Sequence, residues 1–211
     1  WNLIHSNSGF IYTSIQFLNK DTGYAGGSGL IKTTDGGSTW SLVNSIFFED
    51  LFFVNTDTGW CTFSEGLTGG VFKTTNGGTS WTRQLNLGTL NPENIYMYNK
   101  DIGFISKVNT GAPYTRKTTD GGQSWFVVVN NEGFTDINFI DSLTGWRAYG
   151  TMKKTTDGGL NWINQTLPTT YFSQITKFSN VNNDTLWGVN GIISFPNDQA
   201  RAIIYLTTNG G

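Results

Sequence analysis

Apolar residues in this chain come in short alternating runs, separated by clusters of Gly, Asn, Asp and Thr. Ile15 and Phe17 alternate with polar residues, and a four-residue run at 30–33 is followed by a polar, Gly-rich stretch. Alternation with a period of two is typical of half-buried β-strands, and no stretch keeps the period of an amphipathic helix. The pattern predicts an all-β protein built from many short strands.

A phrase reading Thr-Thr-Asp/Asn-Gly-Gly recurs five times and divides these strands into repeats. Its copies begin at Thr33, Thr74, Thr118, Thr155 and Thr207, and the first four are followed by Trp40, Trp81, Trp125 and Trp162. From Trp1 through these four Trp residues, the spacings are 39, 41, 44 and 37 residues. A period near 40 indicates a repeat architecture in which each unit buries its apolar face against its neighbours.

A second phrase, Asn/Asp-x-Asp-x-Gly-aromatic, lies between the Gly-Gly phrases. It spans 19–24, 55–60, 99–104 and, in a variant form, 141–146, while a degenerate copy has Leu186 before Trp187. We interpret it as a turn between the first and second strands of a repeat, in which Asp bonds to the local backbone and Gly supplies a positive φ. The Gly-Gly phrase is interpreted as the turn between the third and fourth strands.

Four antiparallel strands in about 40 residues are the blade of a β-propeller. We therefore predict one propeller domain over 1–211, with repeats at approximately 1–39, 40–80, 81–124, 125–161 and 162–211. The segment Trp1-Asn2-Leu3-Ile4 could pair with the strand around 203–206 and close a five-bladed ring, which would remove free sheet edges. The alternative is an open fragment of a six- or seven-bladed propeller.

Charge and composition narrow the classes of partner. The net charge is −2 and charged residues make up only 13% of the chain, with no basic run, so we expect neither nucleic-acid binding nor membrane insertion. A surface solvated by Asn, Thr and Ser suits a secreted or cell-surface protein. Cys61 is the only cysteine, so no internal disulfide can form, and it is expected to be a small buried residue. A chain beginning at Trp1 is expected to be a processed or partial product, part of a larger secreted chain or surface assembly.

The four complete phrases resemble the Asp-box, or BNR, repeat, Ser/Thr-x-Asp/Asn-x-Gly-x-x-Trp/Phe. The chain is most similar to photosystem II assembly-factor-like propellers and to repeat-bearing secreted proteins of Bacteroidota-like bacteria. Such propellers include sialidases, xyloglucan-cleaving glycosidases, sortilin-type receptors and non-catalytic assembly factors. The resemblance implies that the box lies opposite the ligand-binding end and is structural. Its residues here are Asp35, Trp40, Asn76, Trp81, Asp120, Trp125, Asp157, Trp162 and Asn209.

Binding is expected at the other end, where the connections differ between repeats. From the turn Gly, or Leu186 in its place, to the first Thr of the next phrase, the spans are 10, 15, 15, 10 and 21 residues. Variable loops on a rigid scaffold commonly bind ligands. Aromatic and acidic residues expected there are Tyr12, Phe48, Glu49, Asp50, Glu93, Tyr114, Glu132, Asp136, Tyr149, Tyr171 and Phe172.

The sequence also bears on two catalytic alternatives. A sialidase needs three arginines that converge on the substrate. Of the four arginines present, Arg83 lies on an expected outer strand and Arg147 on an inner one, so three cannot readily converge. A glycosidase needs two carboxyl groups about 5–9.5 Å apart. Asp50, Glu93 and Asp136 start equivalent strands and could provide such a pair. With one His and one Cys, neither a zinc site nor a Ser-His-Asp triad is expected, and no metal or cofactor is predicted.

The sequence therefore favours a non-catalytic recognition or assembly module, extracellular or at the cell surface and of suspected bacterial origin. Its partner would be a protein segment or a glycan bound at the variable-loop end. A glycoside hydrolase with paired carboxylates at the channel mouth is one alternative. An architectural subunit of a surface assembly is the other.

Overall fold

The structure is a computed structural model that describes residues 3, 5–6, 8–63, 69–88, 90–108, 111–168, 175–194 and 199–211. For residues 191–194 and 199–202 it describes the backbone only. Every regular element in the described part of the chain is a β-strand. Within those residues there is accordingly no helix long and apolar enough to cross a membrane.

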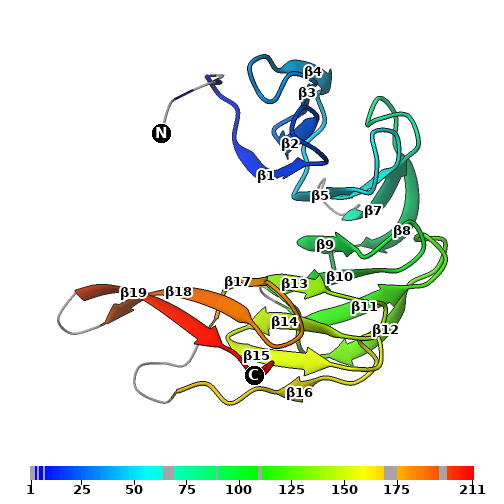
Figure 1. The fold of residues 1–211 in the computed structure, drawn as a ribbon. Helices are drawn as coiled ribbons and strands as arrows, with labels where there is room; N and C mark the ends of the chain where they lie inside the picture. The colour runs from blue at the N-terminus through cyan, green and yellow to red at the C-terminus, as the bar shows by residue number, and fades with distance from the viewer. Residues whose placement is uncertain are drawn as a thin grey trace. The chain divides into compact units, whose positions relative to one another are not determined.

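The strands form five sheets in chain order, which we call blades 1 to 5 (Figure 1). Blade 1 contains β1 (Tyr12–Phe17), β2 (Gly23–Gly27), β3 (Leu30–Thr33) and β4 (Ser41–Asn44). Blade 2 contains β5 (Asp50–Phe53), β6 (Gly59–Phe63), β7 (Gly69–Thr74) and β8 (Thr82–Gly88). Blade 3 contains β9 (Asn94–Met97), β10 (Gly103–Lys107), β11 (Tyr114–Thr118) and β12 (Phe126–Asn130).

Blade 4 contains β13 (Asp136–Phe139), β14 (Gly145–Tyr149), β15 (Thr151–Thr155) and β16 (Ile163–Asn164). Blade 5 contains β17 (Lys177–Asn180), β18 (Leu186–Ser194) and β19 (Gln199–Thr207). The predicted fold class, an all-β propeller of five repeats, is confirmed. Blade 5 has three described strands, and the segment expected to complete it includes Trp1, Asn2 and Ile4, which lie outside the described residues.

The chain forms two compact units. One comprises residues 1–107 and 116–127, and the other comprises 108–115 and 128–211. Blades 1 and 2 lie in the first unit, and blades 4 and 5 in the second. In the first unit β1 contacts β5 and β5 contacts β9, and in the second β13 contacts β17. The first strands of consecutive blades are therefore neighbours within each unit, as they are in a propeller.

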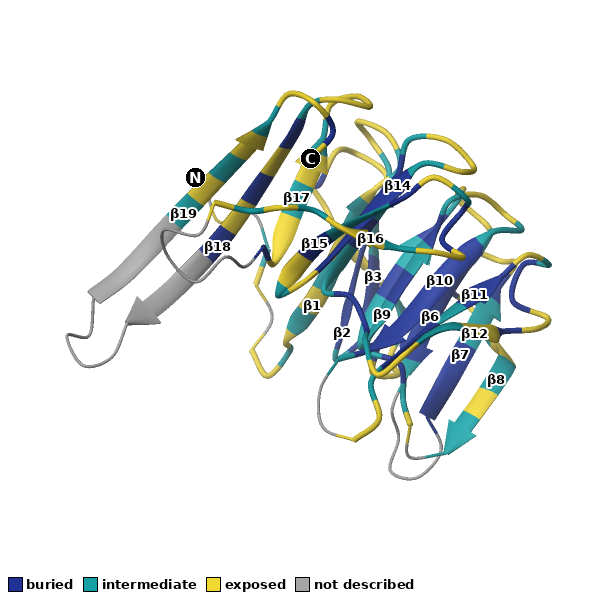
Figure 2. Cartoon of the chain, turned by 90° about the horizontal axis from the view of Figure 1, so that it is seen from below, coloured by how far each residue is buried: buried dark blue, intermediate teal, exposed yellow. Residues whose placement is uncertain are grey.

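Burial changes across a blade in a way that explains its sequence. The second strands β2 and β10 are buried at every position, and β6 at all but its last residue. Short strands enclosed on both faces need small or apolar side chains on both, as in Gly-Tyr-Ala-Gly-Gly of β2. Strand four is less buried, because β4 and β8 contain only intermediate and exposed residues; β8 is drawn in teal and yellow in Figure 2.

Aromatic residues fill the space between adjacent blades. The rings of Tyr24 in blade 1 and Phe53 in blade 2 stack with centroids 3.9 Å apart. Leu30, Phe48, Leu51 and Cys61 complete this buried cluster, so the expectation that Cys61 is a buried residue is confirmed. The second unit has an equivalent core, made by Trp146, Ala148, Met152, Ile175 and Leu186.

Candidate functional site

The turn between strands three and four, here called the Gly-Gly turn, is held by its own side chains. In blade 1, Thr33 Oγ1 donates to Asp35 Oδ1 at 2.8 Å and accepts from the N–H of Gly37 at 2.9 Å. Gly36 and Gly37 have φ values of 71° and 90°, a region that favours glycine. The same two Thr bonds recur in the turns of Asn76, Asp120, Asp157 and Asn209.

Hydrogen bonds also fix the charge of these turns. The hydroxyl and N–H of Thr39 lower the pKa of Asp35 to about 2. Ser124 does the same for Asp120, and the N–H of Asn161 is the largest cause at Asp157; both pKa values fall to about 2. A carboxyl group this acidic is ionised at neutral pH and cannot donate a proton there. The Gly-Gly turns therefore supply no general acid.

The turn between strands one and two, here called the Asx turn, is held by its first residue. Asn19 Oδ1 accepts from the N–H groups of Asp21 and Thr22 at 2.9 and 2.8 Å. Equivalent pairs of bonds form at Asn55, Asn99, Asp141 and Asn182. The prediction that an Asp makes these bonds is confirmed at Asp141, whereas in the other four turns the residue in the same position is Asn, and its side-chain oxygen accepts them.

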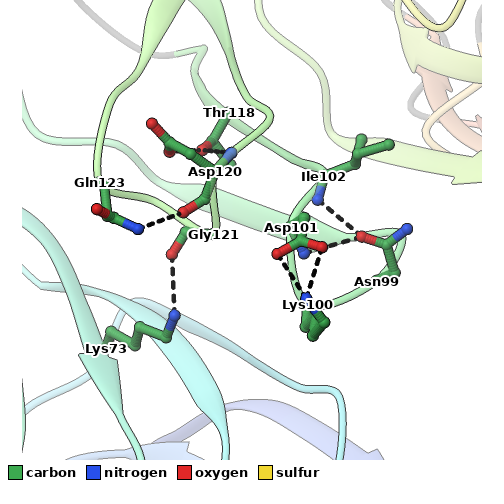
Figure 3. A network of polar contacts seen from close by, with 9 residues as sticks. All are labelled: Lys73, Asn99, Lys100, Asp101, Ile102, Thr118, Asp120, Gly121 and Gln123. Carbon is green, nitrogen blue, oxygen red and sulfur yellow. Dashed lines mark hydrogen bonds and ion pairs between the residues drawn. The ribbon is translucent and has the colours of Figure 1, made fainter.

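The two turns of a blade are joined by a backbone bond. The carbonyl of Asp21 accepts from the N–H of Gly36 at 2.8 Å, and each other blade has the same bond. Figure 3 shows both turns of blade 3, with Asn99 holding one and Asp120 the other. The two recurring phrases therefore lie together at one end of each blade, which we call the scaffold end.

The Gly of the Asx turn has a steric role, whereas a positive φ was predicted for it. Gly23, Gly59, Gly103 and Gly145 all lie outside the positive-φ region. A Cβ on Gly59 would lie 2.6 Å from the ring of Phe53, and one on Gly145 equally close to Phe139. Gly is needed because the large side chain that ends strand one lies flat over it. In blade 5 Asn180 takes the place of that large residue, and the position opposite it is Leu186.

Adjacent blades are locked together at the scaffold end. Trp60 Nε1 in blade 2 donates to the carbonyl of Gly121 in blade 3 at 3.0 Å. Lys73 donates to the same carbonyl at 3.2 Å (Figure 3). Its Nζ lies 4.7 Å from the centroid of the Trp60 ring. Trp146 and Lys154 repeat this arrangement at Gly210 of blade 5. The scaffold end thus uses its polar groups for internal bonds.

At the opposite end, two predicted carboxylates also bind backbone. Asp50 Oδ2 accepts from the N–H of Ile95 on the next blade at 3.0 Å, and its Oδ1 accepts from Leu51 at 2.9 Å. Asp136 makes the matching bonds to Phe178 and Ile137 at 2.9 and 3.1 Å. Burial raises the pKa of Asp136. Both side chains join the first strand of one blade to that of the next.

An ion-pair cluster that the sequence analysis did not identify lies in the second unit. Glu132 accepts from Arg147 Nη2, and from Lys153 Nζ at 2.6 and 2.7 Å. The Arg147 side chain is 2% exposed, donates to the Gly133 carbonyl at 2.7 Å and lies 5.2 Å from the Trp162 ring. Burial raises the pKa of Glu132, but the hydrogen bonds and positive charges of Lys153 and Arg147 outweigh this effect, so the pKa lies below its usual value. The sequence does carry a signal for this cluster: the charged Arg147 stands at the position of β14 where the second strands of blades 1 to 3 have the uncharged residues Ala25, Cys61 and Ile105.

The other predicted binding residues fall into four groups. Phe48 and Tyr114 are buried, so their rings belong to the core. Tyr12 is half-buried with its hydroxyl 3.2 Å from His5 Nε2, and Glu93 pairs with Lys107 at 3.4 Å. Glu49 is half-buried, and Tyr149 is 38% exposed and donates to the Val108 carbonyl. Tyr171 and Phe172 lie outside the described residues.

Two cavities among the described residues have no Asp or Glu carboxyl group in their lining. A cavity of ≈740 Å³ lies beside blade 5, and one of ≈360 Å³ lies on blade 1 next to Tyr12 and His5. The first is lined mainly by apolar side chains, among them Trp146 and Phe178. No group of three or more His, Cys, Asp or Glu side chains able to hold a metal ion occurs in the part of the chain that the structure describes.

Comparison with known proteins supports the fold. No family model matches the chain, and no curated protein sequence matches it. Among solved structures, YCF48 bound to D1 peptide has a TM-score of 0.61 at 15% identity, covering 95% of this chain and 80% of that one. An ancestral GH74 enzyme has a TM-score of 0.74 at 16% identity, covering 98% of this chain and 31% of that one. The nidogen/laminin complex gives 0.67 at 10% identity, covering 95% and 86%.

These similarities concern architecture. The chain spans less than a third of the GH74 enzyme, and all three identities are far below the level at which residues could be matched. Propellers with this strand arrangement include enzymes and non-catalytic binding proteins. The comparisons therefore establish the β-propeller fold.

Proposed function

We propose that this protein is a recognition or assembly module that binds a protein segment at the end of the blades opposite the scaffold end. The observation that carries the proposal is the difference between the two ends. The scaffold end repeats the same side-chain bonds in every blade. The connections at the other end differ from blade to blade in length and chemistry, as binding loops on a rigid scaffold do.

A protein partner is favoured over a glycan by the exposed side chains of these connections. Ile46 and Phe47 between β4 and β5, and Leu90 between β8 and β9, are each 37% exposed. Exposed aliphatic and aromatic side chains beside polar groups are typical of protein interfaces. The solved structures with this fold include one bound to a peptide and one in a complex between two proteins, which supports the same class of partner.

The glycosidase alternative gains no support from the carboxyl groups. A general acid for glycoside hydrolysis needs a raised pKa and a proton free to reach the glycosidic oxygen. Asp136 has the raised pKa, but backbone N–H groups occupy both of its oxygens. Asp50 is bound in the same way. We therefore propose a non-catalytic role, in keeping with the resemblance of the recurring phrase to Asp-box proteins.

The proposed location is extracellular or at the surface of a bacterial cell, where a weakly charged, Asn- and Thr-rich propeller would act alone or within a larger chain. Fractionation of the producing cells with an antibody to this protein tests it. Signal in the medium or the surface fraction supports the location, and signal confined to the cytoplasm contradicts it.

Selection from a random peptide display library, run beside a glycan array, tests the function. Phe47→Ala removes an exposed ring from a variable connection. Leu160→Ala is the matched control, because Leu160 is 52% exposed on a Gly-Gly turn. We expect selected peptides to bind Phe47→Ala at least about tenfold more weakly and Leu160→Ala unchanged. Equal peptide affinity of the unaltered protein and Phe47→Ala would contradict a protein ligand. Glycan binding without peptide binding would contradict it as well.

A further inference from the structure

The strand β19 has an uncovered edge in blade 5. The order of the described strands is β17-β18-β19, so β19 pairs on one side only. It is nine residues long and pairs with β18 without a bulge. Residues 203–207 include no charge and no Pro, and Ile204 and Leu206 are 69% and 50% exposed. Native proteins protect long edge strands with charges, Pro, bulges or a covering segment, and only a covering segment remains for this apolar stretch.

A cavity lies beside this edge. Its volume is ≈740 Å³, within the range of about 300–1,000 Å³ that is usual for ligand sites, and its lining residues all belong to the second unit. The lining includes Tyr205 and Thr207 of β19, together with Trp146, Met152 and Ile175 from the buried core of that unit. The cavity therefore continues the interface between blades 4 and 5 as far as the free edge.

Blade 2 shows which kind of side chain occupies the corresponding position. Trp81 packs against the cluster that contains Leu30, and its ring centroid lies 5.5 Å from that of Phe48 and 6.1 Å from that of Phe53. The repeat aligns Leu30 with Met152, which lines the blade 5 cavity. In position and lining, the cavity therefore matches the site of a fourth-strand Trp.

The Gly-Gly turn gives a second match. A Cβ built on Gly78 would lie 3.5 Å from Cζ2 of Trp81, so the indole ring lies against the second Gly of the turn. In blade 4 the carbonyl of this second Gly, Gly159, also accepts from Trp162 Nε1 at 3.0 Å. The corresponding residue of blade 5 is Gly211, which lines the cavity. The cavity thus includes the residue that, in other blades, contacts the indole ring and accepts its N–H.

The second strand gives a third match. The guanidinium carbon of Arg147 lies 5.2 Å from the centre of the Trp162 ring, and Ala25 lines the blade 1 cavity together with Trp40. The repeat aligns Arg147 and Ala25 with Gly188, which lines the blade 5 cavity. Because Gly188 has no side chain, blade 5 leaves more space for an aromatic ring than blades 1 and 4 do.

We propose that the edge of β19 binds an extended segment of a partner protein, which adds a fourth strand to blade 5 and places a Trp side chain in the cavity. Peptide recognition by strand addition has this form, because main-chain hydrogen bonds give affinity and a pocket for a side chain gives specificity. The site is separate from Ile46, Phe47 and Leu90 of the variable connections, so it is a second binding surface beside that of the proposed function.

The N-terminal segment of the chain contacts another blade. Leu3 and His5 line the cavity on blade 1, where His5 Nε2 lies 3.2 Å from the Tyr12 hydroxyl. These contacts favour a segment of a partner protein, and not residues 1–4, as the strand that covers β19.

The repeat also gives the register of the added strand. Lys32 pairs with Ser41 in blade 1, and Lys73 pairs with Thr82 in blade 2. Ser41 and Thr82 each follow the Trp of their blade, and the repeat aligns the two lysines with Leu206. The residue that follows the Trp of the partner segment is therefore expected opposite Leu206.

A capped peptide with the sequence of residues 40–44, Trp-Ser-Leu-Val-Asn, is the probe, because it contains the Trp and the fourth strand of blade 1. Its binding to the unaltered chain is measured by calorimetry, beside peptides with Ala or Phe in first position. Because a buried Trp removes about 150–250 Å² from water, the Trp peptide should bind at least about tenfold more tightly than the Ala peptide. The Phe peptide lacks the indole N–H and should bind more weakly than the Trp peptide. Hydrogen exchange should show added protection of the amides of residues 203–207.

Phe47→Ala separates this site from that of the proposed function. Binding of the Trp peptide should be the same in this variant, and a loss would place the peptide at the variable connections and overturn the proposal. Equal affinity for the Trp and Ala peptides, or binding of neither, would overturn it as well. Binding that appears only in Trp1→Ala would show that the chain's own first residue fills the cavity, which excludes a partner segment. None of these results decides the proposed function, which the library selection tests through Phe47.

Discussion

The contact between Gly59 and Phe53 allows a sharp test of why the Asx turn ends in Gly. A Cβ at residue 59 would lie 2.6 Å from the Phe53 ring, well inside van der Waals contact, while the backbone there is one that any residue can adopt. We therefore expect Gly59→Ala to destabilise the protein by overpacking, by about 1–3 kcal/mol. For a chain of this size each kcal/mol corresponds to a fall in melting temperature of about 2–4 °C.

The second substitution separates steric from backbone causes. If the ring is responsible, shortening it should remove the penalty, so Gly59→Ala should cost less than about 0.5 kcal/mol in a Phe53→Leu background. Urea unfolding of the wild type, both single variants and the double variant gives the coupling energy. The pair Leu186 and Asn180 in blade 5 already shows the combination of a large residue at the turn and a smaller one opposite. Additive costs in the two backgrounds would refute the steric explanation.

Three further predictions concern stability. The pKa values of the Gly-Gly-turn aspartates lie near 2, below the usual 3.8, so their contribution to stability is present above pH 3.8 and is lost as the pH falls through 2. The urea midpoint of Asp120→Asn should therefore fall less steeply between pH 5 and pH 2 than that of the wild type. Identical slopes would contradict this. Glu132→Ala leaves the buried Arg147 without its carboxylate partner. It should lower the free energy of unfolding, measured in urea, by about 2 kcal/mol, which is less than for a fully buried pair because Glu132 is partly exposed. A cost near zero would show that the cluster does not stabilise the protein. Trp60→Phe should cost about 1 kcal/mol more in stability than Trp81→Phe. The reason is that Trp60 Nε1 donates to a carbonyl, while Trp81 Nε1 is buried without a hydrogen-bond partner in the described structure. Equal losses would show that the Trp60 hydrogen bond does not contribute to stability.

The architecture could be predicted from the sequence because every blade repeats the same local chemistry. A Thr, an Asp or Asn and two Gly residues at fixed spacing specify a turn whose side-chain hydrogen bonds join residues at most four positions apart. The alternation in β5, where Leu51 and Phe53 are buried, specifies which face of the strand packs inward. Such short-range patterns require no knowledge of distant contacts, and repetition makes them unambiguous.

Two details of the same turns could not be predicted, because each depends on the position of a neighbouring group. Whether Asn19 or Asp21 holds the Asx turn is decided by which oxygen reaches the N–H of Thr22. The role of Gly59 is decided by the Phe53 ring across the strand pair. A sequence shows that Gly recurs, but the reason for it lies in a contact between strands.

The candidate site was less predictable, because exposure and pairing are set by packing between blades. Phe48 and Tyr114 were expected on a binding face, and both are buried. Asp50 and Asp136 were correctly placed at strand starts, yet their bonds to the next blade are invisible in sequence. Glu132 and Lys153 are 21 residues apart and meet only because β14 and β15 pair beside the β12–β13 connection.

The measurement that tests the central claim most directly is a hydrogen-exchange footprint of the protein with a selected peptide bound. The account predicts that added protection falls in the connections before strand one, such as residues 45–49, and leaves the Gly-Gly turns unchanged. Protection concentrated in those turns would contradict it, because it would place recognition at the end whose polar groups are used to hold the blades together.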